Sequence, residues 1–221
     1  MAFSSLAEID AYMKTNKCEF WEAVIREEAR DSQQPEMDIV NRMTQMYRSM
    51  KEADEAYDDS LTSRSGLSGK NGKKMADYAA THKCMCGKFG GAVMARAIKM
   101  AESNACMKRI VAAPTAGSCG VVPAILITYE RMTNTSENDM VKALFVAAGI
   151  GDVIARRASI SGARGGCQAE IGASSAMAAG ALAWLKSGSS HLITQAAAMA
   201  LKSLLGLVCD PVAGLVEVPC V

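Results

Sequence analysis

A glycine-rich turn that leads into a long run of small residues constrains the fold more than any other stretch of this chain. The turn reads Ser-Ile-Ser-Gly-Ala-Arg-Gly-Gly over residues 159–166, and an alanine-rich run continues from Cys167 to Leu185. Small side chains let neighbouring helices approach closely, so the run predicts a central, buried helix. Cys167 stands at the start of that helix, where the helix dipole favours the thiolate that metals bind.

Helical periodicity covers most of the remaining chain. Apolar residues recur at helical spacing in further segments, 6–13, 20–25, 39–50, 93–101, 121–129, 141–148 and 192–204. The stripe at 93–101 is expected to turn Arg96 and Lys99 outward. Runs with strand character are few and short, so the expected fold class is all-α, a compact multi-helix domain with glycine-rich loops at its site.

The charge balance and the cysteine content exclude several classes of protein. Lys and Arg number 24 against 23 Asp and Glu, which leaves a net charge of +1 and no field that would attract nucleic acid or an anionic membrane. The apolar stretch from Ile171 to Leu185 is too short to span a bilayer. Eight cysteines without a secretory signal indicate reduced thiols or metal ligands. We therefore expect a cytoplasmic protein with no nucleic-acid or membrane partner.

Three cysteines, Cys167, Cys209 and Cys220, stand in constrained, glycine- or proline-containing segments. Local zinc sites use C-x₂₋₄-C pairs and ferredoxin-type clusters use C-x₂-C-x₂-C runs, and neither pattern occurs in this sequence. Spacing alone leaves two interpretations open, metal ligands and small buried hydrophobes, and it favours the second. Cys84 and Cys86 are one residue apart, so on a strand they would point in opposite directions and would not share a metal.

Two polar loops are candidates for contact with a ligand. The first, over residues 62–72, is rich in serine and glycine, and it is either a linker or a loop that wraps an anion, of which the sequence favours the linker. The second is Pro-Thr-Ala-Gly-Ser at 114–118, just before an apolar helix. Backbone N–H groups at that helix start could bind a carboxylate or phosphate, or Ser118 could satisfy them as a cap. The residues leave both alternatives open.

Three longer strings carry a resemblance to a known family. They are Ile-Val-Ala-Ala-Pro-Thr-Ala-Gly-Ser-Cys-Gly at 110–120, Ser-Ile-Ser-Gly-Ala with Gly-Gly-Cys-Gln-Ala-Glu within 159–170, and Leu-Leu-Gly-Leu-Val-Cys-Asp-Pro-Val-Ala-Gly-Leu-Val-Glu-Val-Pro-Cys at 204–220. Together they resemble the alpha chain, or catalytic domain, of the bacterial iron–sulfur L-serine dehydratases (L-serine ammonia-lyases). The resemblance runs from about residue 66 to the last residue, and more weakly into the N-terminal helices.

The resemblance implies a cofactor and a reaction. It implies that Cys167, Cys209 and Cys220 bind three irons of a [4Fe-4S] cluster and that the fourth iron is open to substrate as a Lewis acid. The implied reaction is the deamination of L-serine to pyruvate and ammonia through dehydration. No pyridoxal phosphate is implied.

The resemblance also implies substrate contacts and partners. The implied substrate-binding residues are Lys83, Asn104, Thr115, Gly117, Ser118, Ser161 and Gly162, with Gly87 in the same loop as Lys83. Ser118 and Ser161 are candidates for the catalytic base, which the sequence does not identify. A beta subunit of the dehydratase is expected as a partner, and a homodimer is a further option. The expected domains are an N-terminal helical segment at 1–60 and a cluster-binding catalytic domain at 61–221, which together form one continuous helical domain.

Several departures from the family pattern keep two alternatives open. Lys108, Cys84, Cys86 and Arg164 replace residues that are usually smaller or less reactive, and the chain stops at Val221, one residue after Cys220. If the sequence is a fragment or shortened form, the last ligand lies on a fraying end. The alternatives are a related cluster-dependent cysteine desulfidase and a truncated, cluster-free helical subunit that only binds a partner.

Overall fold

The chain is helical throughout the part that the structure describes. The structure is a computed structural model, and it describes residues 3–81, 83–207, 211–212, 214–215 and 217. Within these residues there is no strand, and an isolated antiparallel bridge joins Val212 to Leu215. The predicted all-α class is confirmed for this part of the chain. None of its helices is long and apolar enough to cross a membrane.

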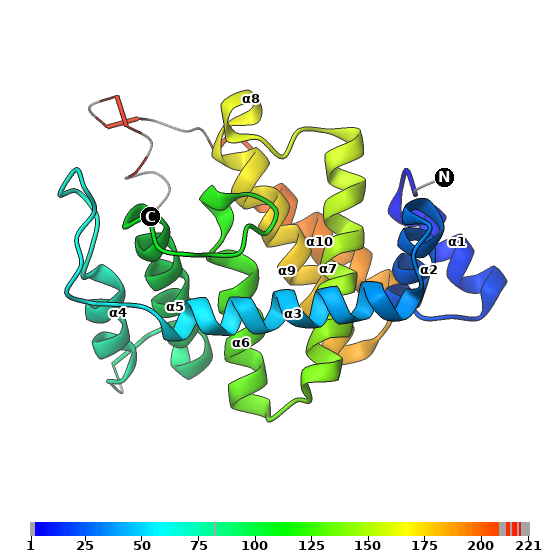
Figure 1. Cartoon of the computed structure of the whole chain (residues 1–221), viewed down its shortest axis with the longest axis horizontal. Coiled ribbons are helices and arrows are strands. Elements are labelled where there is room, and N and C mark those ends of the chain that lie inside the picture. The colour runs from blue at the N-terminus through cyan, green and yellow to red at the C-terminus, as the bar shows by residue number, and fades with distance from the viewer. Residues whose placement is uncertain (1–2, 82, 208–210, 213, 216, 218–221) are drawn as a thin grey trace.

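Three helices form the N-terminal part, and side-chain hydrogen bonds cap the start of the first two. They are α1 (Leu6–Asn16), α2 (Phe20–Ser32) and α3 (Glu36–Glu55). The Ser5 hydroxyl accepts a hydrogen bond from the Glu8 N–H at the start of α1, and Glu19 and Glu22 form a reciprocal capping box at the start of α2. Figure 1 shows α3 crossing the molecule from α1 and α2 at one end to α4 and α5 at the other.

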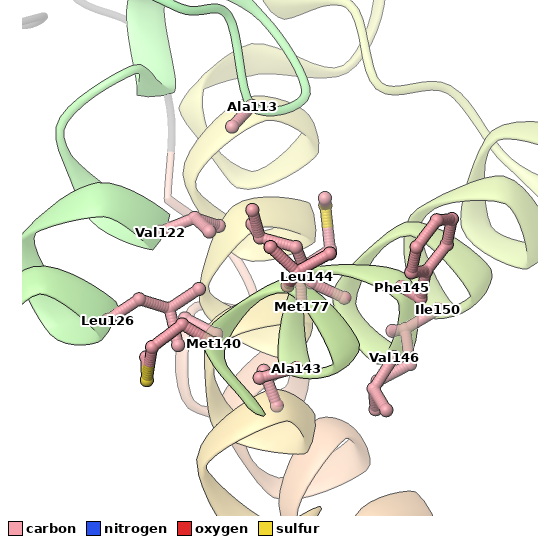
Figure 2. Packing of buried hydrophobic residues seen from close by; sticks show 14 of the residues in the cluster. Ala113, Val122, Leu126, Met140, Ala143, Leu144, Phe145, Val146, Ile150 and Met177 are labelled. Atoms are coloured by element: carbon pink, nitrogen blue, oxygen red, sulfur yellow. The ribbon is translucent and has the colours of Figure 1, made fainter. Parts of the chain in front are cut away.

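The core lies among α6 (Val121–Thr133), α7 (Glu137–Arg157) and α9 (Ala173–Ser187), with α10 (Ser190–Ser203) packed on α9. Buried side chains from these helices form one cluster, part of which Figure 2 shows around α7. A Cβ atom at Gly180 of α9 would lie 2.1 Å from Ile150 Cδ1 of α7, so only glycine permits this approach. The predicted central helix of small residues is therefore present.

Two helices close the other end, α4 (Asn71–Ala79) and α5 (Gly87–Ala105). Arg96 of α5 does not face solvent as predicted. Its Nε donates to Asp54 Oδ1 at 2.7 Å and its guanidinium donates to Thr128 Oγ1 at 2.5 Å. Helix α5 contacts both α3 and α6. These two helices therefore cover the face of α5 that was predicted to be exposed.

The expected boundary near residue 60 crosses one continuous hydrophobic cluster. Phe20 and Tyr47 from the N-terminal helices belong to the same cluster as Leu126 and Phe145. The N-terminal helices thus pack directly on α7, which leads through a short connection to the glycine-rich segment. The division into segments 1–60 and 61–221 stays a prediction.

Candidate active site

The glycine-rich turn before Cys167 is a short helix with a break. Helix α8 spans Gly162–Cys167, and the sharp change of direction falls at Gly166, whose φ of 68° and ψ of −171° suit glycine. A π-helical turn, η2 (Gln168–Gly172), follows and runs into α9. The prediction of a glycine-rich loop here is thus wrong in part, because most of the segment is helical. Cys167 follows the break directly, as expected, and is 6% exposed.

The Pro114–Ser118 loop is stabilised from within. It contains a cis peptide bond between Ala113 and Pro114 and a single turn of 3₁₀ helix, η1 (Ala116–Ser118). Ser118 is 1% exposed, its Oγ lies 3.0 Å from Thr115 Oγ1, and the two residues form a reciprocal capping box. The Ser118 hydroxyl is engaged in hydrogen bonds within this turn, but it does not cap the apolar helix as the second alternative had it, because α6 begins after Gly120 without a side-chain cap.

The end of α5 holds this loop in place. Asn104, in the last turn of α5, donates from Nδ2 to the carbonyl oxygen of Ala116 at 3.1 Å. Asn104, Thr115, Gly117 and Ser118 are therefore brought together, as the resemblance implied. Their part in binding a substrate stays a prediction.

Glu170, which the sequence did not identify as a site residue, joins the two glycine-containing motifs. A Cβ atom at Gly117 would lie 2.9 Å from Glu170 Oε2, and one at Gly162 would lie 2.4 Å from the same oxygen. The carboxylate therefore fills the space that both glycines leave. A signal was present in the sequence, since Glu170 is the one charged residue between Arg164 and Lys186. π-helical turns such as η2 also occur frequently at functional sites.

Ser161 and Gly162 lie at the start of α8, on the other side of this carboxylate from Gly117. The backbone N–H of Ser161 donates to Ser159 Oγ at 3.1 Å, and its carbonyl oxygen accepts from Arg164 and Gly165. In the described part of the chain the Ser161 hydroxyl makes no hydrogen bond, which distinguishes it from Ser118.

Among the described residues, Lys83 and the neighbouring Gly87 lie apart from this group. It is exposed in the loop between α4 and α5, where its carbonyl oxygen accepts from the Tyr78 hydroxyl at 3.2 Å. Gly87 begins α5, whereas Asn104 lies near the end of that helix. The helix has 19 residues, so at about 1.5 Å per residue its ends lie roughly 27 Å apart. The structure therefore does not bring Lys83 to the other site residues.

Of the three predicted metal ligands, Cys167 is described, whereas Cys209 and Cys220 lie outside the described residues. The residues before Cys209 are bonded next to Cys167, since the Gln168 N–H donates to Leu207 O at 3.3 Å and the Gly206 N–H donates to Gln168 Oε1 at 3.1 Å. No group of three His, Cys, Asp or Glu side chains able to hold a metal occurs among the described residues. The three-cysteine ligand set stays a prediction.

The serine-rich loop at 62–72 accepts a carboxylate from the C-terminal segment. Ser65 Oγ donates to Glu217 Oε2 at 2.7 Å, and hydrogen bonds from Ser63, Ser65 and Ser68 hold the pKa of Glu217 below its usual value. Of the two earlier alternatives, the structure favours a loop that wraps an anion over a linker. The loop ends sooner than expected, because Asn71 and Gly72 already belong to α4.

Two departures from the family pattern face away from the grouped residues. Lys108 Nζ donates to the carbonyl oxygen of Ala56, at the C-terminal end of α3. This contact suits a lysine, because a cation is favourable at a helix C-terminus. Arg164 is exposed on α8. Neither side chain obstructs the space between Gly117 and Gly162, which Glu170 fills.

Comparison with known proteins gives one consistent result. Residues 15–221 match the family described as the serine dehydratase alpha chain. The chain is 38% identical over 219 residues to a probable L-serine dehydratase alpha chain of Bacillus subtilis (strain 168), covering 99% of this chain and 73% of that protein. It is 44% identical over 148 residues to the L-serine dehydratase alpha chain of Peptoniphilus asaccharolyticus, covering 67% of this chain and 51% of that protein.

A third relative is a longer protein. Over 126 residues the chain is 46% identical to L-serine dehydratase 1 of Escherichia coli (strain K12), which covers 57% of this chain and 28% of that protein. The matched share of the relatives thus ranges from about three quarters down to about a quarter of their length. The family match covers nearly the whole of this sequence, and the chain belongs to the serine dehydratase alpha-chain family.

Proposed function

We propose that this chain is the catalytic alpha chain of an iron–sulfur L-serine dehydratase, which converts L-serine to pyruvate and ammonia. The observation that carries the proposal is the meeting of two family motifs beside Cys167: the Thr115–Ser118 loop and the Ser161–Glu170 segment approach each other across the Glu170 carboxylate. Family membership and the names of the relatives support the same reaction.

The residues present fit a [4Fe-4S] cluster held by Cys167, Cys209 and Cys220. Thiolates are the ligands of such clusters, and Cys167 is a buried thiol directly before η2, beside the glycine-containing motifs. Gln168 bonds to Leu207, and the two peptide units from Leu207 to Cys209 span at most about 7 Å. When bound, the cluster would supply a Lewis acid that binds the substrate hydroxyl. No pyridoxal phosphate is needed.

The chain's own residues would bind and orient the substrate. Thr115 and Ser161 offer hydroxyl groups on the two sides of the Glu170 carboxylate, and Asn104 holds the first of these loops in position. Of the two serines considered as base, Ser161 is better suited, since its hydroxyl has no partner among the described residues whereas Ser118 caps η1. A beta-chain partner is expected, because relatives are named alpha chains.

Anaerobic reconstitution with iron and sulfide tests the proposal. We expect the full chain to acquire about four irons and a visible absorbance band, and to form pyruvate from L-serine with its beta chain present. Cys167→Ser and Cys209→Ser should each abolish the band, because each removes a ligand. Cys18→Ser, at the turn between α1 and α2, is the matched control and should retain it.

Two outcomes would count against this assignment. Retention of the full absorbance by Cys209→Ser would show that the ligand set is wrong. Faster release of sulfide from L-cysteine than of pyruvate from L-serine would favour the cysteine desulfidase alternative.

A further inference from the structure

Glu170 is a carboxylate placed between two backbone segments that have no side chain there. Its Oε2 atom would be 2.9 Å from a Cβ at Gly117 and 2.4 Å from a Cβ at Gly162. Any other residue at either position would displace the carboxylate or be displaced by it. At both glycines the nearest atom is the same carboxylate oxygen, Oε2, followed by Cδ.

The Glu170 carboxylate is not used to stabilise the fold. In the described part of the chain it makes no hydrogen bond and no ion pair. The motif residues grouped around it, Asn104, Thr115, Ser118 and Ser161, are uncharged. Glu170 therefore brings a carboxylate, without a cationic partner among the residues that the structure describes, into a group of hydroxyls and amides.

We propose that Glu170 binds the α-ammonium group of the amino-acid substrate and thereby selects α-amino acids over α-hydroxy acids. The inference rests on the proposed function, because it takes the space beside Cys167 to be the substrate site. An ammonium group offers three N–H donors and a full positive charge, and charge-assisted hydrogen bonds are about twice as strong as neutral ones. A carboxylate without competing donors is suited to this group, whereas a hydroxyl in its place would offer one uncharged donor.

The role makes Glu170 a specificity-determining residue. The cluster, when bound, would supply a Lewis acid for the substrate hydroxyl on Cβ, and Ser161 would serve the proton on Cα, the carbon that carries the ammonium group. Gly117 and Gly162 position this carboxylate, because their lack of a Cβ lets it lie between η1 and α8.

Binding to the cluster-loaded full chain, measured by anaerobic equilibrium dialysis, tests the proposal without requiring turnover. The two probes are L-serine and L-glycerate, which carries a hydroxyl in place of the ammonium group. We expect Glu170→Gln to weaken L-serine binding by about 10- to 100-fold, as for loss of a hydrogen bond to a charged group, and to leave L-glycerate binding within about twofold or tighter. Gly162→Ala should also weaken the binding of L-serine relative to that of L-glycerate, because its Cβ displaces the carboxylate.

A matched control and the opposing outcomes make the test decisive. Glu28→Gln removes an exposed carboxylate of α2 and should leave both affinities unchanged. Equal losses of L-serine and L-glycerate in Glu170→Gln, or an unchanged L-serine affinity, would overturn the ammonium assignment alone. If Glu170→Gln does not fold, the relative affinity of Gly162→Ala for L-serine and L-glycerate decides between the same two outcomes. Failure of the wild-type chain to bind L-serine at all would instead overturn the proposed function and this inference with it.

Discussion

Two inward-facing carboxylates, Glu102 and Glu170, lie against glycines in different parts of the molecule and have opposite surroundings. Glu102 of α5 is 2% exposed and accepts hydrogen bonds from the Tyr57 hydroxyl at 2.7 Å, from Asn71 N at 2.7 Å and from Gly72 N at 3.0 Å. Glu170 of η2 lies between Gly117 and Gly162 and has no such donor in the described part of the chain.

The difference separates a structural carboxylate from one that is available to a ligand. Glu102 satisfies two of the free N–H groups at the start of α4 and so fixes the end of the serine-rich loop. A buried charge is tolerated when it is fully hydrogen-bonded, and Glu102 meets that condition. Glu170 keeps its hydrogen-bonding capacity for another molecule. Both carboxylates lie beside glycines, so the number of hydrogen-bond donors distinguishes them.

The largest expected effect on stability is that of Glu102→Gln. The substitution replaces an acceptor oxygen by an N–H₂ group that faces N–H and O–H donors, so we expect the free energy of unfolding to fall by about 2–3 kcal/mol. Glu170→Gln should change it by less than about 0.5 kcal/mol, as expected of a substitution away from bonded groups. Urea unfolding of the two variants measures both values. Similar losses in the two variants would remove the distinction.

A smaller effect on stability is expected when Gly72, beside Glu102, or Gly162, beside Glu170, is replaced by alanine. A Cβ at Gly72 would lie 2.6 Å from Lys99 Cγ and 3.0 Å from Lys99 Cα, so Gly72→Ala should cost about 1–2 kcal/mol through overpacking. Gly162→Ala meets a carboxylate that can rotate away, so its cost should be smaller. Thermal unfolding of the pair tests this order, and a larger loss for Gly162→Ala would show that the Glu170 position is structurally important.

The smallest effect belongs to a third carboxylate, Glu137, which is bonded at the surface. Hydrogen bonds from Arg48 and Lys51 lower its pKa from 4.5 to about 2. Because the folded-state pKa is depressed, the stabilisation is present above pH 4.5 and is lost as the pH falls towards 2. Glu137→Gln should therefore cost less than about 1 kcal/mol at pH 7, as is usual for exposed pairs, and nothing near pH 2. Urea titrations at both pH values check this, and a pH-independent difference would contradict it.

Local sequence patterns predicted most helices, and failed where a distant segment determined the environment. The run of small residues after Cys167 identified α9, because close packing requires small side chains over several turns. Arg96 was assigned to the outer face, yet it pairs with Asp54 across α3 and α5. The stripe within one helix does not reveal how many neighbours cover it.

The site was predicted only in part, again because distant segments determine which residues meet. Asn104 and the Thr115–Ser118 loop were proposed from motif resemblance, and a hydrogen bond joins them. Lys83 came from the same resemblance and lies at the other end of α5. Glu170 was missed, since a single charge in an apolar run has no partner visible in the sequence.

The amino-acid sequence by itself determined the helical class, the position of Cys167 at a helix start and the family of the chain, because periodicity, glycine placement and motif strings are properties of neighbouring residues. Only the tertiary structure decided which side chains are engaged: Ser118 in a cap, Glu102 by three donors, and Glu170 between Gly117 and Gly162. The contacts of Glu102 with Tyr57 and Asn71, and of Glu170 with Gly117, join segments far apart along the chain, so they form only when α4 packs on α5 and η1 packs on η2.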